Sequence, residues 1–148
     1  MFRRGHVRSE SGSVSLELIF AVGFLLIPAA ALLAQFPTWI GTTQAAQVAA
    51  TEAARQIVLA DDMTSGIAAA TETALEVIAN HGLDVGDLLD LTVTASPPGD
   101  LQRGQVVTVT VTVRGSPILV PGLGSVGNPF DAVGSATERV DDYRGFAP

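Results

Sequence analysis

The most prominent pattern in the chain is an apolar run near its amino terminus. From Val14 to Phe36 there are 23 residues, and only Ser15, Glu17 and Gln35 among them are polar. As a helix that rises ~1.5 Å per residue, this run would be about 35 Å long, enough to cross the hydrocarbon core of a bilayer. The pattern therefore predicts a membrane-spanning helix.

Two prolines and a tryptophan mark the second half of this run and its end. Pro28 lies inside the run and removes one backbone hydrogen bond, so we expect a kink or a local loosening there. Pro37 predicts a second break near the far membrane face. Trp39 follows closely, and an indole at that depth is typical of the aromatic belt at a membrane interface.

Residues 38–60 continue with a helical period and many alanines. One stripe is polar and consists of Gln44, Gln47, Thr51 and Arg55. Another stripe is apolar and consists of Ala46, Ala50, Ala53, Ile57 and Ala60. Because small side chains let helices approach closely, the apolar stripe could pack within its own domain or against helices of neighbouring subunits.

Residues 61–65 break this pattern and can cap a second helix, which is predicted to end before Gly82. Its expected apolar face consists of Ile67, Thr71, Ala74, Leu75 and Ile78. Its expected polar face consists of Glu72, Glu76 and Asn80.

The last third of the chain changes to a period of two. Valines and threonines alternate between residues 105 and 114, which predicts a strand with one buried face and one wet face. Residues 91–95 form a shorter partner across a loop at 96–104, with Leu91, Val93 and Ala95 inward. A third strand is expected at about 130–140, after a Pro/Gly-rich connection. The chain thus reads as α+β, with a small antiparallel sheet of about three strands following the helices.

The charges are divided unevenly along the chain. Residues 1–12 hold three arginines and one glutamate, whereas the other 136 residues hold five arginines and 14 acids. A short basic arm before a single span predicts a cytoplasmic amino terminus and an extracytoplasmic carboxy-terminal domain. That acidic domain would repel nucleic acid, so we expect no nucleic-acid partner. The chain has no cysteine, which excludes disulfides and thiol chemistry.

Several motifs resemble nucleotide, metal or catalytic sites, but the residues around them do not fit such sites. The stretch 122–127, GLGSVG, fits a dinucleotide-binding pattern, but Asn128-Pro129 follows where a helix would have to open. The acids at 84, 87 and 90 lack the spacing of a calcium loop. Isolated His6 and His81 make no metal site, and the serines have no triad partners. We therefore expect no catalytic, cofactor-binding or metal site, and a protein that is not an enzyme.

The apolar run has two ordinary explanations. It could be a secretory signal, because residues 31–34, Ala-Leu-Leu-Ala, end in a shape that signal peptidase cuts near Ala34. However, the run is longer than the usual 7–15 apolar residues of such signals. It could also be a plain single-pass anchor, in which Glu17 lies at the interface at little cost. The domain would then be an adaptor that binds an envelope partner through its sheet edge.

The segment 12–17, Gly-Ser-Val-Ser-Leu-Glu, followed by a long apolar helix, resembles the class III signal of type IV pilin-like proteins. More narrowly, the chain resembles the TadE-like pseudopilins of tight-adherence (Tad/Flp) pilus systems. The further cues are the proline in the apolar run, TTQAAQVAATEAARQ after it, VTVTVTV, and the Pro/Gly-rich stretch from Pro117. The resemblance covers the first 60 residues well and the strands loosely.

This resemblance implies how the amino terminus is processed and used. A prepilin peptidase would cut between Gly12 and Ser13, which makes Glu17 the fifth residue of the mature chain. The new amine on Ser13 would be positive, and Glu17 would attract the amine of a neighbouring subunit. Such a pair gains Coulomb energy in a low dielectric, although desolvation takes back much of it.

The sequence thus predicts a minor pseudopilin that takes part in the initiation or assembly of a Tad/Flp-type pilus or related secretion filament. Its expected parts are a cytoplasmic leader at 1–12, a transmembrane helix at 13–36 and an extracytoplasmic α+β domain at 37–148. Its expected partners are the prepilin peptidase, other pilin or pseudopilin subunits, Tad assembly membrane proteins and membrane lipid. The alternatives are a small secreted domain released near Ala34 and the single-pass adaptor.

Overall fold

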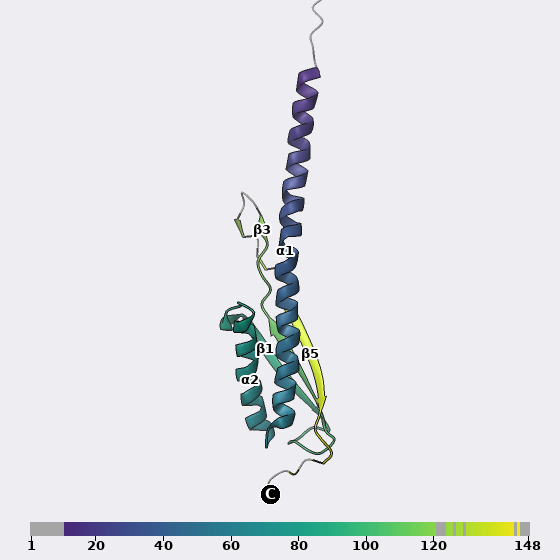
Figure 1. The fold of residues 1–148 in the computed structure, drawn as a ribbon, viewed down its shortest axis with the longest axis vertical. Helices are drawn as coiled ribbons and strands as arrows, with labels where there is room; N and C mark the ends of the chain where they lie inside the picture. The colour runs from purple at the N-terminus through teal and green to yellow at the C-terminus, as the bar shows by residue number, and fades with distance from the viewer. Residues whose placement is uncertain (1–10, 121–123, 126, 129, 144, 146–148) are drawn as a thin grey trace, which may run out of the picture.

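In the computed structural model, one long helix carries a small α+β domain along its carboxy-terminal half (Figure 1). The structure describes residues 11–120, 124–125, 127–128, 130–143 and 145. The helices are α1 (Ser11–Leu59), α2 (Met63–Asn80) and a 3-10 turn, η1 (Val85–Asp87). The strands are β1 (Leu88–Ser96), β2 (Val106–Val113), β3 (Leu119–Val120), β4 (Gly124–Ser125) and β5 (Ala132–Arg139). The predicted α+β class, with two helices and a three-stranded antiparallel sheet, is confirmed.

Helix α1 is 49 residues long and continues through both Pro28 and Pro37. The break predicted at Pro37 is therefore wrong. A proline removes the hydrogen bond of its own nitrogen and crowds the carbonyl four residues before it, but the turns on either side keep their hydrogen bonds and can continue the helix. At ~1.5 Å per residue, α1 is about 74 Å long, so its first half extends well beyond the packed domain.

The alanine-rich half of α1 forms the centre of the core. Its fully buried side chains are Ala45, Ala46, Ala49, Ala50, Ala53, Ala54 and Ile57. The polar stripe predicted on the opposite face is exposed, as expected. The buried face is wider than the predicted stripe because α1 packs against α2 on one side and against the sheet on the other. This answers the question left by the sequence, since these alanines pack within their own domain.

Helix α2 begins at a well-formed cap. Asp62 accepts a hydrogen bond from the backbone N–H of Ser65 at 2.9 Å, and this bond lowers the pKa of the Asp62 carboxyl from its usual 3.8. The helix ends before Gly82, whose φ of +75° suits glycine. The side of α2 that is fully buried consists of Gly66, Ala70, Ala74 and Ile78. It is turned slightly from the predicted face, because Ile67 is exposed.

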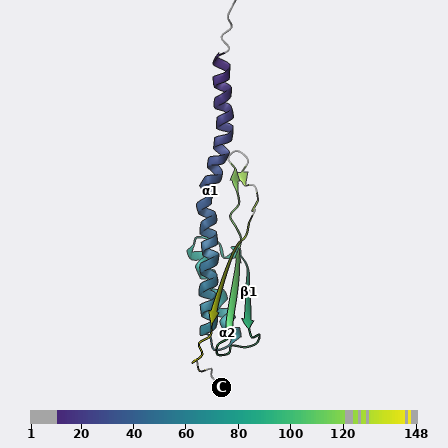
Figure 2. The same ribbon diagram turned by 90° about the vertical axis from the view of Figure 1, so that its right-hand side faces the viewer.

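The main sheet is antiparallel with the order β1-β2-β5, and it runs beside the lower half of α1 (Figure 2). The central strand β2 buries four valines completely: Val107, Val109, Val111 and Val113. In β1, Leu91, Val93 and Ala95 pair with these valines and share their inward face, as predicted. The threonines of β2 lie on the other face, where Thr108 and Thr137 hydroxyls meet at 3.0 Å.

Strand β5 touches the backbone of α1 directly. Gly134 lies so close to Ala46 that a Cβ built on it would overlap the Ala46 carbonyl and lie 2.5 Å from the Gln47 nitrogen. Next to this contact, the Gln47 side-chain amide donates to the Ser135 carbonyl at 2.9 Å and accepts from the Ser135 N–H at 3.3 Å. Gln47 thus occupies the backbone groups of Ser135 that a further strand would use on this edge of β5.

Candidate functional site

The amino-terminal half of α1 projects from the domain as an apolar rod (Figure 1). Its exposed large apolar side chains are Leu16, Leu18, Ile19, Phe20, Val22, Phe24, Leu25, Leu26, Ile27, Leu32, Leu33 and Phe36. Phe24 is the most exposed of them, at 85%. A helix that is apolar on all sides needs lipid or other protein around it. By length and composition it is able to cross a membrane, or to act as a signal sequence.

Glu17 lies at the start of this rod and is exposed. It makes no hydrogen bond or ion pair with any residue that the structure describes. The predicted processing residues, Gly12 and Ser13, belong to the first turn of α1, and the leader residues 1–10 lie outside the described residues. Residues 12, 13 and 17 all lie within the first two turns of α1, and their roles in processing and docking remain predictions.

An aromatic group marks the level at which the rod meets the domain. The Phe36 and Trp39 rings are 5.6 Å apart, and Trp39 meets the Phe130 ring at 6.2 Å with an interplanar angle of 79°. Edge contacts of this kind stabilise aromatic pairs. Beside Trp39 and Phe130 lies a pocket of about 210 Å³, which also touches Thr42, Gly115 and Asp131. Trp39 therefore joins α1 to the chain that leads into β5.

A second contact lies one turn closer to the rod. The Gln35 amide donates to the Leu119 carbonyl at 3.0 Å and accepts from the Leu119 N–H at 2.8 Å. It also donates to the Ala31 carbonyl at 3.2 Å. This contact holds the small ribbon of β3 and β4 against α1. The sequence did not predict the ribbon, because its Pro/Gly-rich composition indicated only a connection between strands.

The motifs that the sequence analysis set aside have structural explanations in the described part of the chain. His81 ends α2, with its Nδ1 atom 2.8 Å from the Val77 carbonyl oxygen. Asp84 and Asp87 cap η1. In the nucleotide-like stretch, Gly124 belongs to β4, and the next described element is β5 rather than a helix. Among the described residues, no group of three His, Cys, Asp or Glu side chains could hold a metal ion.

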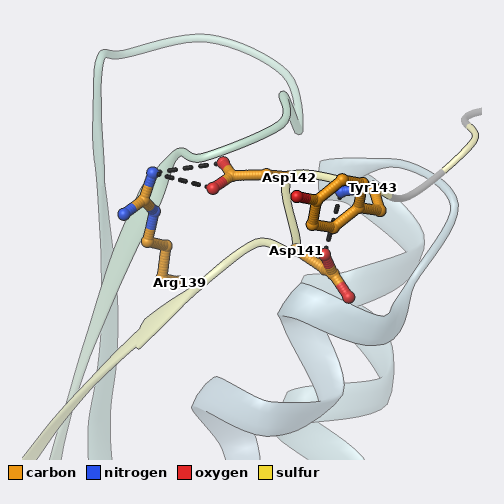
Figure 3. A network of polar contacts seen from close by, with 4 residues as sticks. All are labelled: Arg139, Asp141, Asp142 and Tyr143. Carbon is orange, nitrogen blue, oxygen red and sulfur yellow. Dashed lines mark hydrogen bonds and ion pairs between the residues drawn. The ribbon is translucent and has the colours of Figure 1, made fainter.

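A polar cluster lies at the carboxy-terminal end of β5 (Figure 3). The Arg139 guanidinium bonds both carboxylate oxygens of Asp142, at 3.1 and 3.2 Å. Asp141 accepts a hydrogen bond from the Tyr143 backbone N–H at 2.9 Å. Both partners of the ion pair are more than half exposed, and such pairs add little stability. The cluster shapes the turn that ends β5, and Arg139, Asp141 and Tyr143 line a shallow pocket of about 420 Å³ together with Val58 and Leu59.

The combination of a long apolar helix at the amino terminus and a small antiparallel sheet packed on its second half is a pilin-like architecture. Comparisons with protein-family models, with curated proteins and with solved structures found no match to this chain. The shape and the residues of the chain are therefore the observations on which a function has to rest.

Proposed function

We propose that this chain is a membrane-anchored minor pseudopilin of the Tad/Flp type, which helps to initiate or assemble a pilus or a related secretion filament. The observation that carries the proposal is the exposed apolar rod of α1 with a carboxylate near its start, Glu17, which pairs with none of the described residues. A rod of this kind can lie in lipid before assembly and pack against other such helices afterwards.

Glu17 acts in this proposal as the docking group for a neighbouring subunit. Cleavage after Gly12 would place a positive amine on Ser13, one helical turn from Glu17. The carboxylate of one chain would attract the amine of the next, and this attraction is strong only where water is excluded. A pair formed across two chains fixes how far one rod is shifted along the other, whereas apolar contact alone leaves that shift free.

The course of α1 past Ala34 supports this proposal over release by signal peptidase. The helix continues without interruption from the rod into the core, and Gln35 binds the ribbon directly after the would-be cleavage site. A cut at Ala34 would fall inside α1, whose part after the cut is packed in the domain. Retention of the whole rod agrees better with this arrangement.

The test of processing is the mass and amino-terminal sequence of the protein isolated from the membranes of its native host. We expect a chain that begins at Ser13. A chain that begins near Gln35 would refute the proposal in favour of secretion, and a chain that keeps residues 1–12 would favour a plain anchor. Gly12→Ile should block processing, whereas Gly23→Ala, in the same helix with open space around it, should not.

The test of docking is the recovery of Glu17→Gln in the filament fraction. This change keeps the size of the side chain and removes its charge, so we expect normal processing but poor incorporation. Glu72→Gln is the matched control, because Glu72 is an exposed acid on α2 away from the rod. Normal incorporation of the Glu17 variant would show that Glu17 has no docking role.

A further inference from the structure

The ribbon of β3 and β4 lies at the same height along α1 as the end of the apolar run. Residues 18–34 contain no polar side chain, and Gln35, the next residue, binds the Leu119 backbone through both the NH2 group and the oxygen of its side-chain amide. A hydrocarbon core of ~30 Å accommodates about 20 helical residues. If α1 spans a bilayer through residues 18–34, Gln35 and Leu119 lie together at the outer boundary of the hydrocarbon core.

The side chains around this contact are apolar and exposed. Leu119 is 60% exposed and Phe130 is 68% exposed, while Phe36 and Ile40 on α1 are about half exposed. We call these four residues the boundary patch. In the sequence, residues 115–130 carry no charge, and Arg114 and Asp131 stand at the two ends of this stretch. An exposed apolar surface bounded by charges is typical of a site that contacts a membrane or a protein.

Several backbone polar groups at this level are paired within the described residues. The amide of Gln35 pairs with the N–H and C=O of Leu119, and Ile118 donates its N–H to the Gly127 carbonyl at 3.1 Å. Strands β3 and β4 pair with each other through Leu119–Ser125 and Val120–Gly124. Unpaired backbone groups keep irregular segments out of lipid, so each of these pairs lowers the cost of placing the ribbon at the membrane surface.

We propose that the boundary patch is a second membrane contact, which rests in the outer interface of the bilayer that α1 crosses. This inference depends on the part of the proposed function that keeps α1 as a membrane span, and not on filament assembly. Lipid is the occupant because the patch is continuous with the apolar rod and lies at the depth where that rod ends. The patch ties the domain to the membrane surface at two places, so the domain cannot turn freely about α1.

The absence of cysteine allows a direct measurement of depth. The full chain would carry a single nitroxide label on Leu119→Cys or Phe130→Cys. Each labelled variant would be reconstituted at one chain per nanodisc of phosphatidylethanolamine and phosphatidylglycerol, so that a second copy cannot cover the patch. The rate at which the label collides with oxygen, which concentrates in lipid, is divided by the rate at which it collides with a water-soluble nickel complex. A high oxygen-to-nickel ratio means that the label lies in lipid. Leu25→Cys in the rod and Thr137→Cys on the outer face of the sheet provide the lipid and water references.

We expect the labels at positions 119 and 130 to give an oxygen-to-nickel ratio several-fold above that at position 137. We also expect Gln35→Ala to move the label at 119 toward water, whereas Gln44→Ala, with no bond to the ribbon, should leave it unchanged. Ratios at 119 and 130 equal to that at 137 would overturn the proposal. Spin–spin broadening between chains in vesicles, together with water-like ratios in nanodiscs, would overturn it in favour of a second copy as the occupant.

Failure of the two proposals can be told apart. A water-like ratio at position 25 would show that the rod is not a membrane span, which overturns this inference together with the anchored function. Lipid-like ratios at 119 and 130 in a chain that joins no filament would support the membrane contact and refute the pseudopilin role.

Discussion

The close contact between β5 and α1 predicts that Gly134→Ala is strongly destabilising. A Cβ at this position would lie 2.5 Å from the Gln47 nitrogen and still closer to the Ala46 carbonyl, while ordinary contacts begin at 3.4 Å, so helix and strand must separate by more than about 0.9 Å. The nearest atoms belong to the helix backbone, which cannot swing aside as a side chain can. Overpacking of this kind costs about 1–3 kcal/mol.

The separation also affects the hydrogen bonds beside the contact. The bond from the Ser135 N–H to Gln47 is already 3.3 Å long, and a shift of this size would break it. Loss of the two bonds of Gln47 adds about 1 kcal/mol, since each contributes about 0.5–1.5 kcal/mol at best and both are exposed. The total of about 3 kcal/mol is a substantial part of the 5–15 kcal/mol that stabilises a typical domain.

The assay is urea unfolding of the full chain in detergent micelles, followed by the fluorescence of Trp39, the single tryptophan of the chain. Trp39 touches Phe130 just before β5, so its emission reports the separation of this segment from α1. Gly41→Ala is the control, because Gly41 lies inside α1 with open space around it, and the same change there should stabilise by about 0.5–1 kcal/mol. An unfolding midpoint for Gly134→Ala at or above the wild-type value would refute the close contact.

Two smaller changes test other contacts of the domain by the same assay. Gln47→Ala should lower the free energy of unfolding by about 1 kcal/mol, whereas Gln44→Ala on the same polar stripe should have almost no effect; equal effects would argue against the bonds to β5. The lowered pKa of Asp62 means that its carboxylate stabilises the fold above its unfolded-state pKa, and that this stability is lost as the pH falls below about 3.8 toward the folded-state value. Asp62→Asn keeps a capping side chain without the charge, so the difference in stability between wild type and variant should shrink through that acidic range. A difference that stays constant with pH would contradict the assigned cause.

The elements that the sequence predicted well are those with a clear period or a clear cap. The alternation of valine and threonine fixed the faces of β2, because burial on one side of a strand requires a period of two. The segment 61–65, which contains the capping Asp62, and Gly82 marked both ends of α2, because helix ends need specific partners.

The sequence could not show contacts that depend on how separate elements meet. Gln44 and Gln47 look alike on the polar stripe, yet only Gln47 faces the edge of β5. Gly134 inside a strand signals either a bulge or a close approach, and only the packed structure distinguishes them. Gln35 looked like the polar end of an apolar run, and its bond to Leu119 joins positions 84 residues apart. The roles of Gly12, Ser13 and Glu17 remain predictions for the experiments above.

The amide of Gln47 on β5 has a consequence for how copies of this protein can associate. At Ser135 the chain's own helix already binds the outward backbone N–H and C=O of β5. A strand of another copy would have to displace Gln47 to pair along this border. Strand pairing between copies should therefore favour the β1 border of the sheet over the β5 border.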